Sequence, residues 1–198
     1  MVTFLIGLIC LTLVVIGVLM IVVYNRLVVL KNRFINALSH IDVQLKRRYD
    51  LVPNLVESAR AYLSHEKGTF EEIARLRVQA ISGISQDFRS GQPKDLIQND
   101  LALSRAIGHL AAVIESYPDL KADKTIANLM EDLSSVENRV SFARQAYNDA
   151  VMEYNQTRES FPAFMFASLM HFKQAWFWWA ETETRSKPNL NPLTNRSA

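Results

Sequence analysis

IANLMEDLSSVENRVSFARQAYNDAVMEY, residues 126–154, carries apolar residues at alternating steps of three and four along its whole length. This spacing places them on one face of an α-helix, and its persistence over about four heptads is what close packing against neighbouring helices requires. The segment therefore predicts a long helix inside a helical bundle. Its apolar stripe consists of Ile126, Leu129, Leu133, Val136, Val140, Ala143, Tyr147, Ala150 and Tyr154.

Three further segments on the N-terminal side show the same helical period. The first runs from Leu27 to Tyr62, the second from Phe70 to Ile84, and the third over residues 94–116. No segment alternates with a period of two, so no sheet is expected. Four amphipathic stripes joined by short connections predict an all-α fold, an antiparallel up-down four-helix bundle over residues 25–160.

Glycine and proline mark the expected connections between these helices. SHEKG (64–68) separates the first two, because glycine disfavours helix by about 1 kcal/mol relative to alanine. SQDFRSGQPKD (85–95) is the clearest loop. SYPDLKAD (116–123) ends the third helix, since a residue before proline avoids the helical region, and its Asp123 is placed to cap the fourth. Phe161-Pro162 ends the fourth helix.

The N-terminal end of the chain is of a different kind. Residues Phe4 to Tyr24 include no charged side chain, and at the helical rise they extend over roughly 31 Å, the thickness of a bilayer core. No Lys or Arg precedes this stretch and no A-x-A cleavage pattern follows it, which argues against a secretory signal peptide. Cys10 would suit a lipoprotein, but Ile9 before it is too bulky for that processing site. The sequence predicts an uncleaved transmembrane anchor, residues 1–24, that continues directly into the first bundle helix.

Positive charge lies on the C-terminal side of this span, which places the bundle in the cytoplasm by the positive-inside rule. The single cysteine lies in the span and gives the rest of the chain nothing to cross-link. A net charge of +2 without a basic block gives no nucleic-acid footprint, so no nucleic-acid partner is expected. The charges that set the orientation are Arg26, Lys31, Arg33, Lys46, Arg47 and Arg48.

No constellation of residues indicates an enzyme, a metal or a cofactor. Di-iron bundles use Glu-x-x-His, and zinc proteases use His-Glu-x-x-His. None of the four histidines has a glutamate three residues away or another histidine four residues away, and no Gly-x-Ser-x-Gly motif or glycine-rich phosphate loop occurs. We therefore expect a non-enzymatic protein without a cofactor. The histidines are His40, His65, His109 and His171.

IDVQLKRRYDLVPN, residues 41–54, is the one segment that mixes clustered charge with the apolar stripe. Three interpretations stay open: a solvated face with an Asp42–Lys46 pair, a buried polar layer against the fourth helix, and a ligand or catalytic site. Pro53 favours a kink over a helix end, because the stripe continues through it, and it leaves backbone carbonyls free for other groups. The candidate structural or interaction residues are Asp42, Gln44, Arg47, Arg48, Tyr49, Asp50, Pro53, Asn54, Arg144, Tyr147 and Asn148.

AFMFASLMHFKQAWFWW, residues 163–179, holds seven aromatic residues and lies in an aromatic amphipathic segment, 161–184. Burial against the bundle, a helix at the membrane interface and a self-association surface are the alternatives, and a second span of this length is marginal. With a break near Gly68 the fourth helix returns this segment to the bilayer; if the first two helices form one rod, it emerges far away. Residues 185–198 are expected to be disordered. The candidate interface or self-association residues are Phe164, Phe166, Trp176, Phe177, Trp178 and Trp179.

Several motifs resemble the LemA family. They are YNRLVVLKN, IDVQLKRRYDLVPNLVE, HE, SYPDLKAD, ENRVSFARQAYNDAVMEYN and the closing FP and FK, and they extend from Tyr24 to about Glu181. The resemblance implies a bacterial membrane-anchored helical bundle with no assigned catalytic activity. It also implies relatives associated with envelope quality control beside a membrane metalloprotease, or with organelle-like membrane formation in magnetic bacteria. The aromatic segment after Pro162 departs from the family pattern.

Two functions follow as hypotheses. The first is a homo-oligomeric scaffold or adaptor, anchored in membrane lipid at the cytoplasmic face of the bacterial inner membrane. The alternative, which depends on the resemblance alone, is a regulatory partner of a membrane metalloprotease in envelope quality control. An enzyme that uses the Asp42–Asp50 cluster is the least favoured interpretation.

Overall fold

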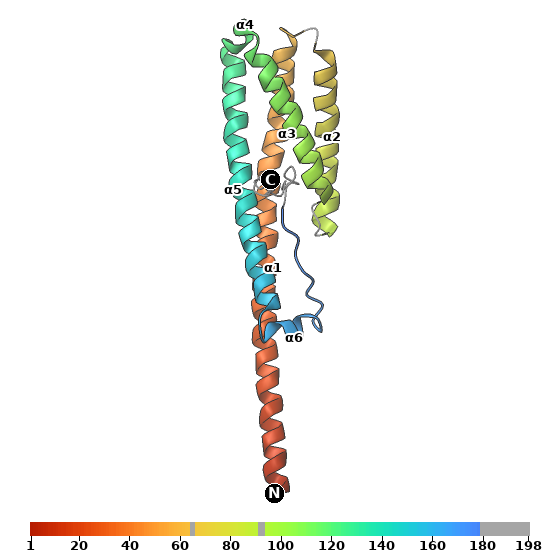
Figure 1. The fold of residues 1–198 in the computed structure, drawn as a ribbon, viewed down its shortest axis with the longest axis vertical. Coiled ribbons are helices and arrows are strands. Elements are labelled where there is room, and N and C mark those ends of the chain that lie inside the picture. Colours follow the sequence, from red (N-terminus) through yellow and green to blue (C-terminus); the bar gives the residue numbers. More distant parts are fainter. Residues whose placement is uncertain (64–65, 91–93, 179–198) are drawn as a thin grey trace, which may run out of the picture.

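The computed structural model describes residues 1–63, 66–90 and 94–178. For residues 83–90 and 94 it describes the backbone alone. Within this part every regular element is a helix, which confirms the predicted all-α class. Figure 1 shows their arrangement along one long axis. The helices are α1 (Val2–Arg60), α2 (Lys67–Ser90), α3 (Lys94–Glu115), α4 (Pro118–Lys121), α5 (Lys124–Glu159) and α6 (Ala163–Ala167).

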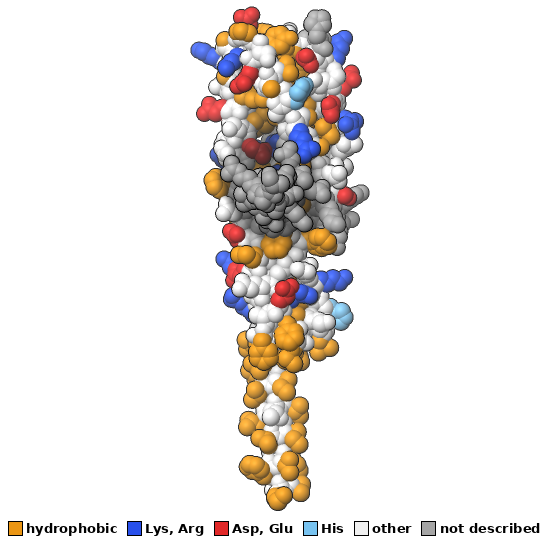
Figure 2. Space-filling model, viewed as in Figure 1, with side chains coloured by type: hydrophobic (Ala, Val, Ile, Leu, Met, Phe, Trp, Pro, Cys, Tyr) orange, Lys and Arg blue, Asp and Glu red, His pale blue; other side chains and the backbone are white. Residues whose placement is uncertain are grey.

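Helix α1 is a rod of 59 residues with two different surroundings. Its first third stands alone below the bundle as a narrow stalk covered by hydrophobic side chains (Figure 2). Among the described helices, α1 is the one long and apolar enough to cross a membrane. From Val23 onward its buried residues recur at helical spacing and pack against the rest of the chain. The predicted continuation of the apolar span into the bundle is therefore seen.

Helices α1 and α5 lie side by side over most of the length of α5, and α2 packs against α3 (Figure 1). The contacts between α1 and α5 run in opposite order along the two helices. Arg33 pairs with Glu153 near the stalk, and Tyr62, just after α1, donates to Asp123, the N-cap of α5, at the far end. The last turn of α5 consequently returns the chain to the level of the stalk, where α6 lies.

Where the predicted stripes face one another, the buried residues form two clusters, and the partly buried Phe34 and Ala175 contact both of them. One large cluster of buried residues runs from Leu38 to the top of the bundle, and a smaller one joins Val23, Leu27 and Leu30 to α6. The largest fully buried side chains of the two clusters together are Tyr49, Tyr147, Tyr154, Phe70, Leu27, Leu30, Ile41, Leu45, Leu55, Ile73, Leu96 and Leu103.

Helix boundaries agree with the glycine and proline signals, with one correction. Helix α5 is capped as expected, since the Asp123 side chain accepts from the backbone N–H groups of Thr125 and Ile126 at 2.8 and 3.2 Å. The predicted loop at residues 85–95 is too long, because α2 continues to Ser90. The sequence reason is that residues 85–90 contain no glycine or proline. The first residues of these types, Gly91 and Pro93, come after Ser90 and lie outside the described residues.

The aromatic segment is not one amphipathic helix. Helix α6 has five residues, and His171 then adopts a left-handed backbone conformation (φ 58°) that turns the chain round. From Phe172 to Trp178 the chain has no helix and runs back along the bundle (Figure 1). The predicted membrane-surface position is thereby corrected for Trp178, which is buried in the main core cluster. Trp179 and the expected disordered tail lie outside the described residues.

Candidate functional site

A carboxylate from α3 lies at the centre of the bundle and contacts three cationic or hydroxyl groups. Asp100 is 1% exposed. Its Oδ1 accepts from the Arg48 guanidinium at 3.3 Å and from the Tyr49 hydroxyl at 3.2 Å, and its Oδ2 accepts from Arg144. Glu137 adds a second carboxylate, 3.0 Å from Arg48. We call these five residues the Asp100 cluster; its two positive and two negative side chains balance.

Helix periodicity explains why these groups meet. Asp100 occupies the one polar position in the α3 stripe, four residues after Leu96 and three before Leu103. Arg48 and Tyr49 are both buried on α1, and Arg144 is partly buried on α5. One carboxylate therefore joins α1, α3 and α5. Such a layer pairs its charges with one another and fixes the register of the helices that supply it, while the buried Glu137 Oε2 and Arg144 Nε make no hydrogen bond.

Burial dominates the acid–base properties of the cluster. It raises the pKa of the Asp100 carboxyl above the ordinary 3.8, against the opposing attraction of Arg48 and Arg144. Burial and, next, the negative charge of Asp100 raise the pKa of the Tyr49 hydroxyl far above 10, so Tyr49 remains a neutral donor. The arrangement can hold charge inside the bundle, and its polar groups are directed at one another.

The structure brings together only part of the predicted polar motif. Arg48, Tyr49 and Arg144 meet as members of the Asp100 cluster. Asp42 instead pairs with Lys46 at 2.8 Å on its own helix, so it does not reach α5. Gln44 is half-buried, and the outer face of α1 leaves exposed three of the predicted residues, Arg47, Asp50 and Asn54.

Asp100 itself was missed by the sequence reasoning. A signal for it exists, because the third stripe passes from Leu96 to Leu103 and the intervening position at helical spacing is Asp100. A charged residue in an apolar stripe must find a partner, and two cations lie close to facing stripes: Arg48, next to Tyr49, and Arg144, one residue after Ala143.

Pro53 has the effect expected from its missing N–H. It lies inside α1, which continues through it, so the carbonyl of Tyr49 four residues earlier has no helical donor. The Nε of Arg77, from α2, donates to this carbonyl at 2.6 Å. The proline thus creates an acceptor within α1 and α2 supplies its partner. A shallow cavity of about 350 Å³ beside this contact is lined by residues of α1 and α2, including Pro53 and Arg77.

A repeated Tyr-Asn pair on α5 binds the backbone of the extended segment, residues 172–178. Asn148 donates to the carbonyl of Trp178 at 3.1 Å and accepts from its N–H at 2.7 Å. Asn155, seven residues later, makes the same two bonds with Ala175, both at 2.9 Å. Each asparagine amide therefore pairs with the chain as a neighbouring strand would.

The tyrosines of the two pairs extend this contact. Tyr147 donates to the carbonyl of Trp176 at 2.7 Å, and Tyr154 donates to that of Lys173 at 2.8 Å. Burial raises the pKa of Tyr147 to about 12, so it is a neutral donor at physiological pH. Arg158 adds a bond to the carbonyl of Phe172 at 2.9 Å. This set of backbone contacts explains why the segment follows α5.

Some of the predicted aromatic residues are buried against the bundle and others are exposed. Trp178 is 4% exposed, with its ring 6.5 Å from that of Tyr147 and beneath the Arg144 guanidinium. Phe166 and Phe177 are half-buried, while Trp176 and Phe164 are 44% and 55% exposed. Asn148, a candidate for the polar layer in one of the three interpretations, binds the extended segment instead, as does Tyr147.

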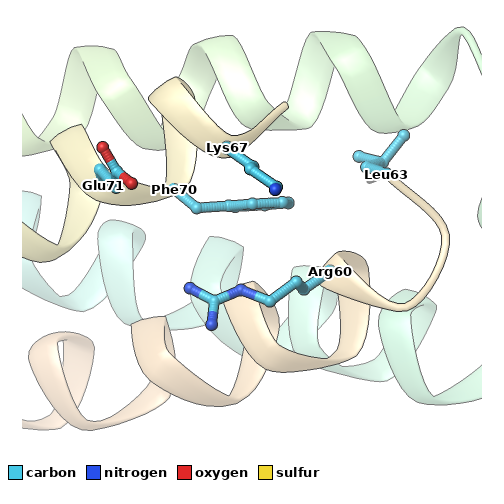
Figure 3. A pocket seen from close by; sticks show the side chains of 5 residues that line it. All are labelled: Arg60, Leu63, Lys67, Phe70 and Glu71. Carbon is cyan, nitrogen blue, oxygen red and sulfur yellow. The ribbon is translucent and has the colours of Figure 1, made fainter. Parts of the chain in front are cut away.

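A cavity of about 330 Å³ lies at the end of the bundle farthest from the stalk (Figure 3). Arg60 from α1 extends beneath the ring of Phe70 from α2, with its guanidinium carbon 5.8 Å from the ring centroid. Lys67, Glu71 and Leu63 complete the lining. Among the described residues, no group of three or more His, Cys, Asp or Glu side chains could hold a metal ion; His65 lies outside them.

An apolar stalk, a long α1–α5 pair and a buried carboxylate that joins three helices define a helical-bundle protein built on one apolar rod. The chain belongs to the LemA family, whose sequence profile matches residues 37–191. The resemblance drawn from the motifs is therefore confirmed.

Curated relatives of the chain are magnetosome proteins. It is 26% identical over 171 residues to the magnetosome proteins MamQ 1 and MamQ 2 of Paramagnetospirillum magneticum, with 77% of this chain and 63% of each relative covered. It is 24% identical over 155 residues to MamQ of Magnetospirillum gryphiswaldense, with 69% and 57% covered. The chain thus spans less than two thirds of the length of these relatives. The family and these relatives suggest a membrane-associated protein without a known catalytic activity.

Proposed function

We propose that the protein is a non-enzymatic, membrane-anchored scaffold or adaptor that self-assembles at the cytoplasmic face of a bacterial inner membrane. Its four long helices, α1, α2, α3 and α5, work as one antiparallel unit held upright on the apolar stalk. Similarity to proteins named for the magnetosome supports a role in membrane organisation.

One observation carries this proposal: the charged side chains inside the bundle bind one another. Asp100 is 1% exposed and accepts from Arg48, Tyr49 and Arg144. A catalytic acid needs access to the proton that it moves. A carboxylate buried among three helices instead fixes their relative position, which is the property that a scaffold needs.

The mass of the purified full-length protein tests self-assembly. The protein would be solubilised in two detergents of different micelle size and measured by size-exclusion chromatography with light scattering over a tenfold concentration range. We expect the same closed multimer in both detergents. A monomer throughout would contradict the scaffold and favour the adaptor alternative, a regulatory partner of a membrane metalloprotease.

A further inference from the structure

Large apolar side chains at the base of the bundle remain exposed to solvent. Phe161, Phe164, Met165 and Leu169 are 77%, 55%, 57% and 68% exposed. Phe161 precedes α6, Phe164 and Met165 lie on it, and Leu169 lies in the turn after it, so all four belong to one short exposed stretch. Ala163 and Ala167 of the same helix are instead buried, with 5% and 2% exposed. We call the four exposed residues the α6 apolar face.

The position of this face along α1 suggests what covers it. Ala163 and Ala167 pack in one cluster with Val23, Leu27 and Leu30 of α1. The ring of Tyr24, the last residue of the uncharged stretch, lies 5.7 Å from that of Phe172, just after the turn. In Figure 2 hydrophobic side chains gather where the bundle narrows to the stalk. The α6 apolar face therefore lies level with the end of the apolar span.

We propose that the α6 apolar face is a second membrane contact, which inserts its side chains at the boundary between lipid headgroups and acyl chains. This inference rests on the proposed anchoring of α1 in a bilayer. Apolar and aromatic side chains favour that depth, because insertion there removes their apolar surface from water.

The charges around the face fit an anionic lipid surface. Lys31 and Lys173 are exposed at the same end of the bundle, and Arg26 and Arg33 are 58% and 65% exposed while they share Glu153. Cations beside an inserted apolar face add attraction to anionic headgroups. A single span would let the bundle swing about α1, whereas a second contact beside the span fixes its tilt and rotation.

Collision-accessibility measurements on a spin label test the depth of the face. The full chain with Cys10→Ser would carry one label at Met165→Cys and be reconstituted in vesicles of phosphatidylcholine and phosphatidylglycerol. Val14→Cys in the middle of the span and Val78→Cys on α2 are the matched lipid and water references, both exposed at 63% in the protein. Oxygen dissolves in the bilayer and a nickel chelate stays in water, so the ratio of their collision rates reports depth.

We expect a high oxygen-to-nickel ratio at position 14, a low one at 78 and an intermediate one at 165. A ratio at 165 equal to that at 78 overturns the inference while leaving the anchor intact. Protection of 165 from both reagents also overturns it and indicates a second copy of the chain on this face. A low ratio at position 14 would refute the proposed anchoring itself, and the inference with it.

A paired substitution separates the face from the rest of the bundle. Phe161→Gln with Phe164→Gln should move the ratio at position 165 towards that at 78, because the two largest inserted side chains are lost. Phe142→Gln, a phenylalanine on α5 that is 72% exposed, should leave the ratio unchanged. An unchanged ratio in the double variant would show that these phenylalanines do not hold the segment in the membrane.

Discussion

Asp100 connects three helices of the bundle, because Arg48 and Tyr49 of α1 and Arg144 of α5 all donate to it. Removing one member of a buried ion group leaves its partners charged and without compensation. This destabilises a protein strongly, unlike replacement of the whole group by apolar residues. The exposed charges of the same α1 segment are in a different position, since water solvates them whether or not they are paired.

Asp100→Asn should lower the free energy of unfolding by about 3 kcal/mol, because it leaves the two arginines with one negative charge, that of Glu137, between them. Asp50→Asn, an exposed carboxyl on α1, should change it by less than about 0.5 kcal/mol. Urea unfolding followed by circular dichroism in a mild detergent measures both. Equal losses in the two variants would contradict a special role for Asp100.

Asp123 gives the bundle a pH-dependent component. Hydrogen bonds from the backbone N–H of Ile126, then from Tyr62 and Thr125, lower the pKa of its carboxyl below the ordinary 3.8. A group whose folded pKa is lowered stabilises the fold above its unfolded pKa, and this contribution is lost as the pH falls through the folded pKa. The relevant window therefore lies below about pH 4.

Asp123→Asn should keep the cap at neutral pH but show a smaller drop in Tm on acidification, because asparagine accepts the same bonds without titrating. Thermal unfolding from about pH 6 to pH 3 measures the drop. Asp132→Asn, an exposed carboxyl on the same helix, is the control and should follow the unmodified protein. If the Tm of both variants falls on acidification as much as that of the unmodified protein, the charge of Asp123 does not contribute to stability.

At the residue scale the sequence predicts local features well and distant partners poorly. The Asp123 cap follows from residues next to it. One of the three open interpretations joins Arg48 and Arg144 in a polar layer, but it does not identify their partner Asp100, because that choice needs the relative rotation of α1, α3 and α5. That rotation is decided by packing of complete stripes and not by any single residue.

At the scale of elements, α1 and α2 depend on each other through the Pro53 position. The proline removes the donor for the Tyr49 carbonyl, and the Arg77 side chain replaces it. A buried carbonyl without a donor costs about 1–3 kcal/mol, so the two residues should be energetically coupled.

A double-mutant cycle of Pro53→Ala and Arg77→Met measures this coupling. Arg77→Met alone should destabilise by about 1–3 kcal/mol, because it orphans the carbonyl while keeping the length of the side chain. In the Pro53→Ala background the new N–H bonds to the carbonyl, so the same change should cost at least about 1 kcal/mol less. An identical cost in both backgrounds would refute the coupling. Unfolding by urea, as for Asp100, supplies the four free energies.

The extended segment depends on α5 in a comparable way. Asn155→Ala removes the two hydrogen bonds between the Asn155 side chain and the backbone of Ala175. The amide of Ala175 should therefore exchange hydrogen about 10–100 times faster. Gln156→Ala, the exposed neighbour, is the matched control. Hydrogen exchange followed by mass spectrometry resolves the segment. Unchanged exchange would show that other contacts hold it, and faster exchange throughout α5 would indicate general loss of the fold.

The elements show why periodicity predicts helices better than the segments after them. Four apolar stripes identified the four long helices, because the period itself carries the information. The aromatic composition of residues 163–179 carries none about direction. A turn at His171 and side chains of α5, more than ten residues earlier, set the course of this segment, and neither follows from local pattern.

At the scale of the whole molecule, the opposite order of the α1–α5 contacts brings the end of α5 back to the level of the stalk. The α4 turn, residues 118–121, consequently lies at the end of the bundle farthest from the stalk (Figure 1). Which compartment it occupies depends on how the chain inserts. Lys and Arg residues close to a span are retained in the cytoplasm, and Arg26, Lys31 and Arg33 all follow the span directly.

Cysteine labelling in a bacterial host tests this orientation. In a Cys10→Ser background, Asp119→Cys in the exposed α4 turn should react with a membrane-impermeant maleimide only after the cells are broken, as the proposed cytoplasmic position of the bundle requires. Val2→Cys, at the other end of the span, should react in intact cells. The reverse pattern would place the bundle outside the cytoplasm. Arg26 and Arg33 would then have to cross the membrane before they could pair with Glu153, against the strongest charge bias in the chain.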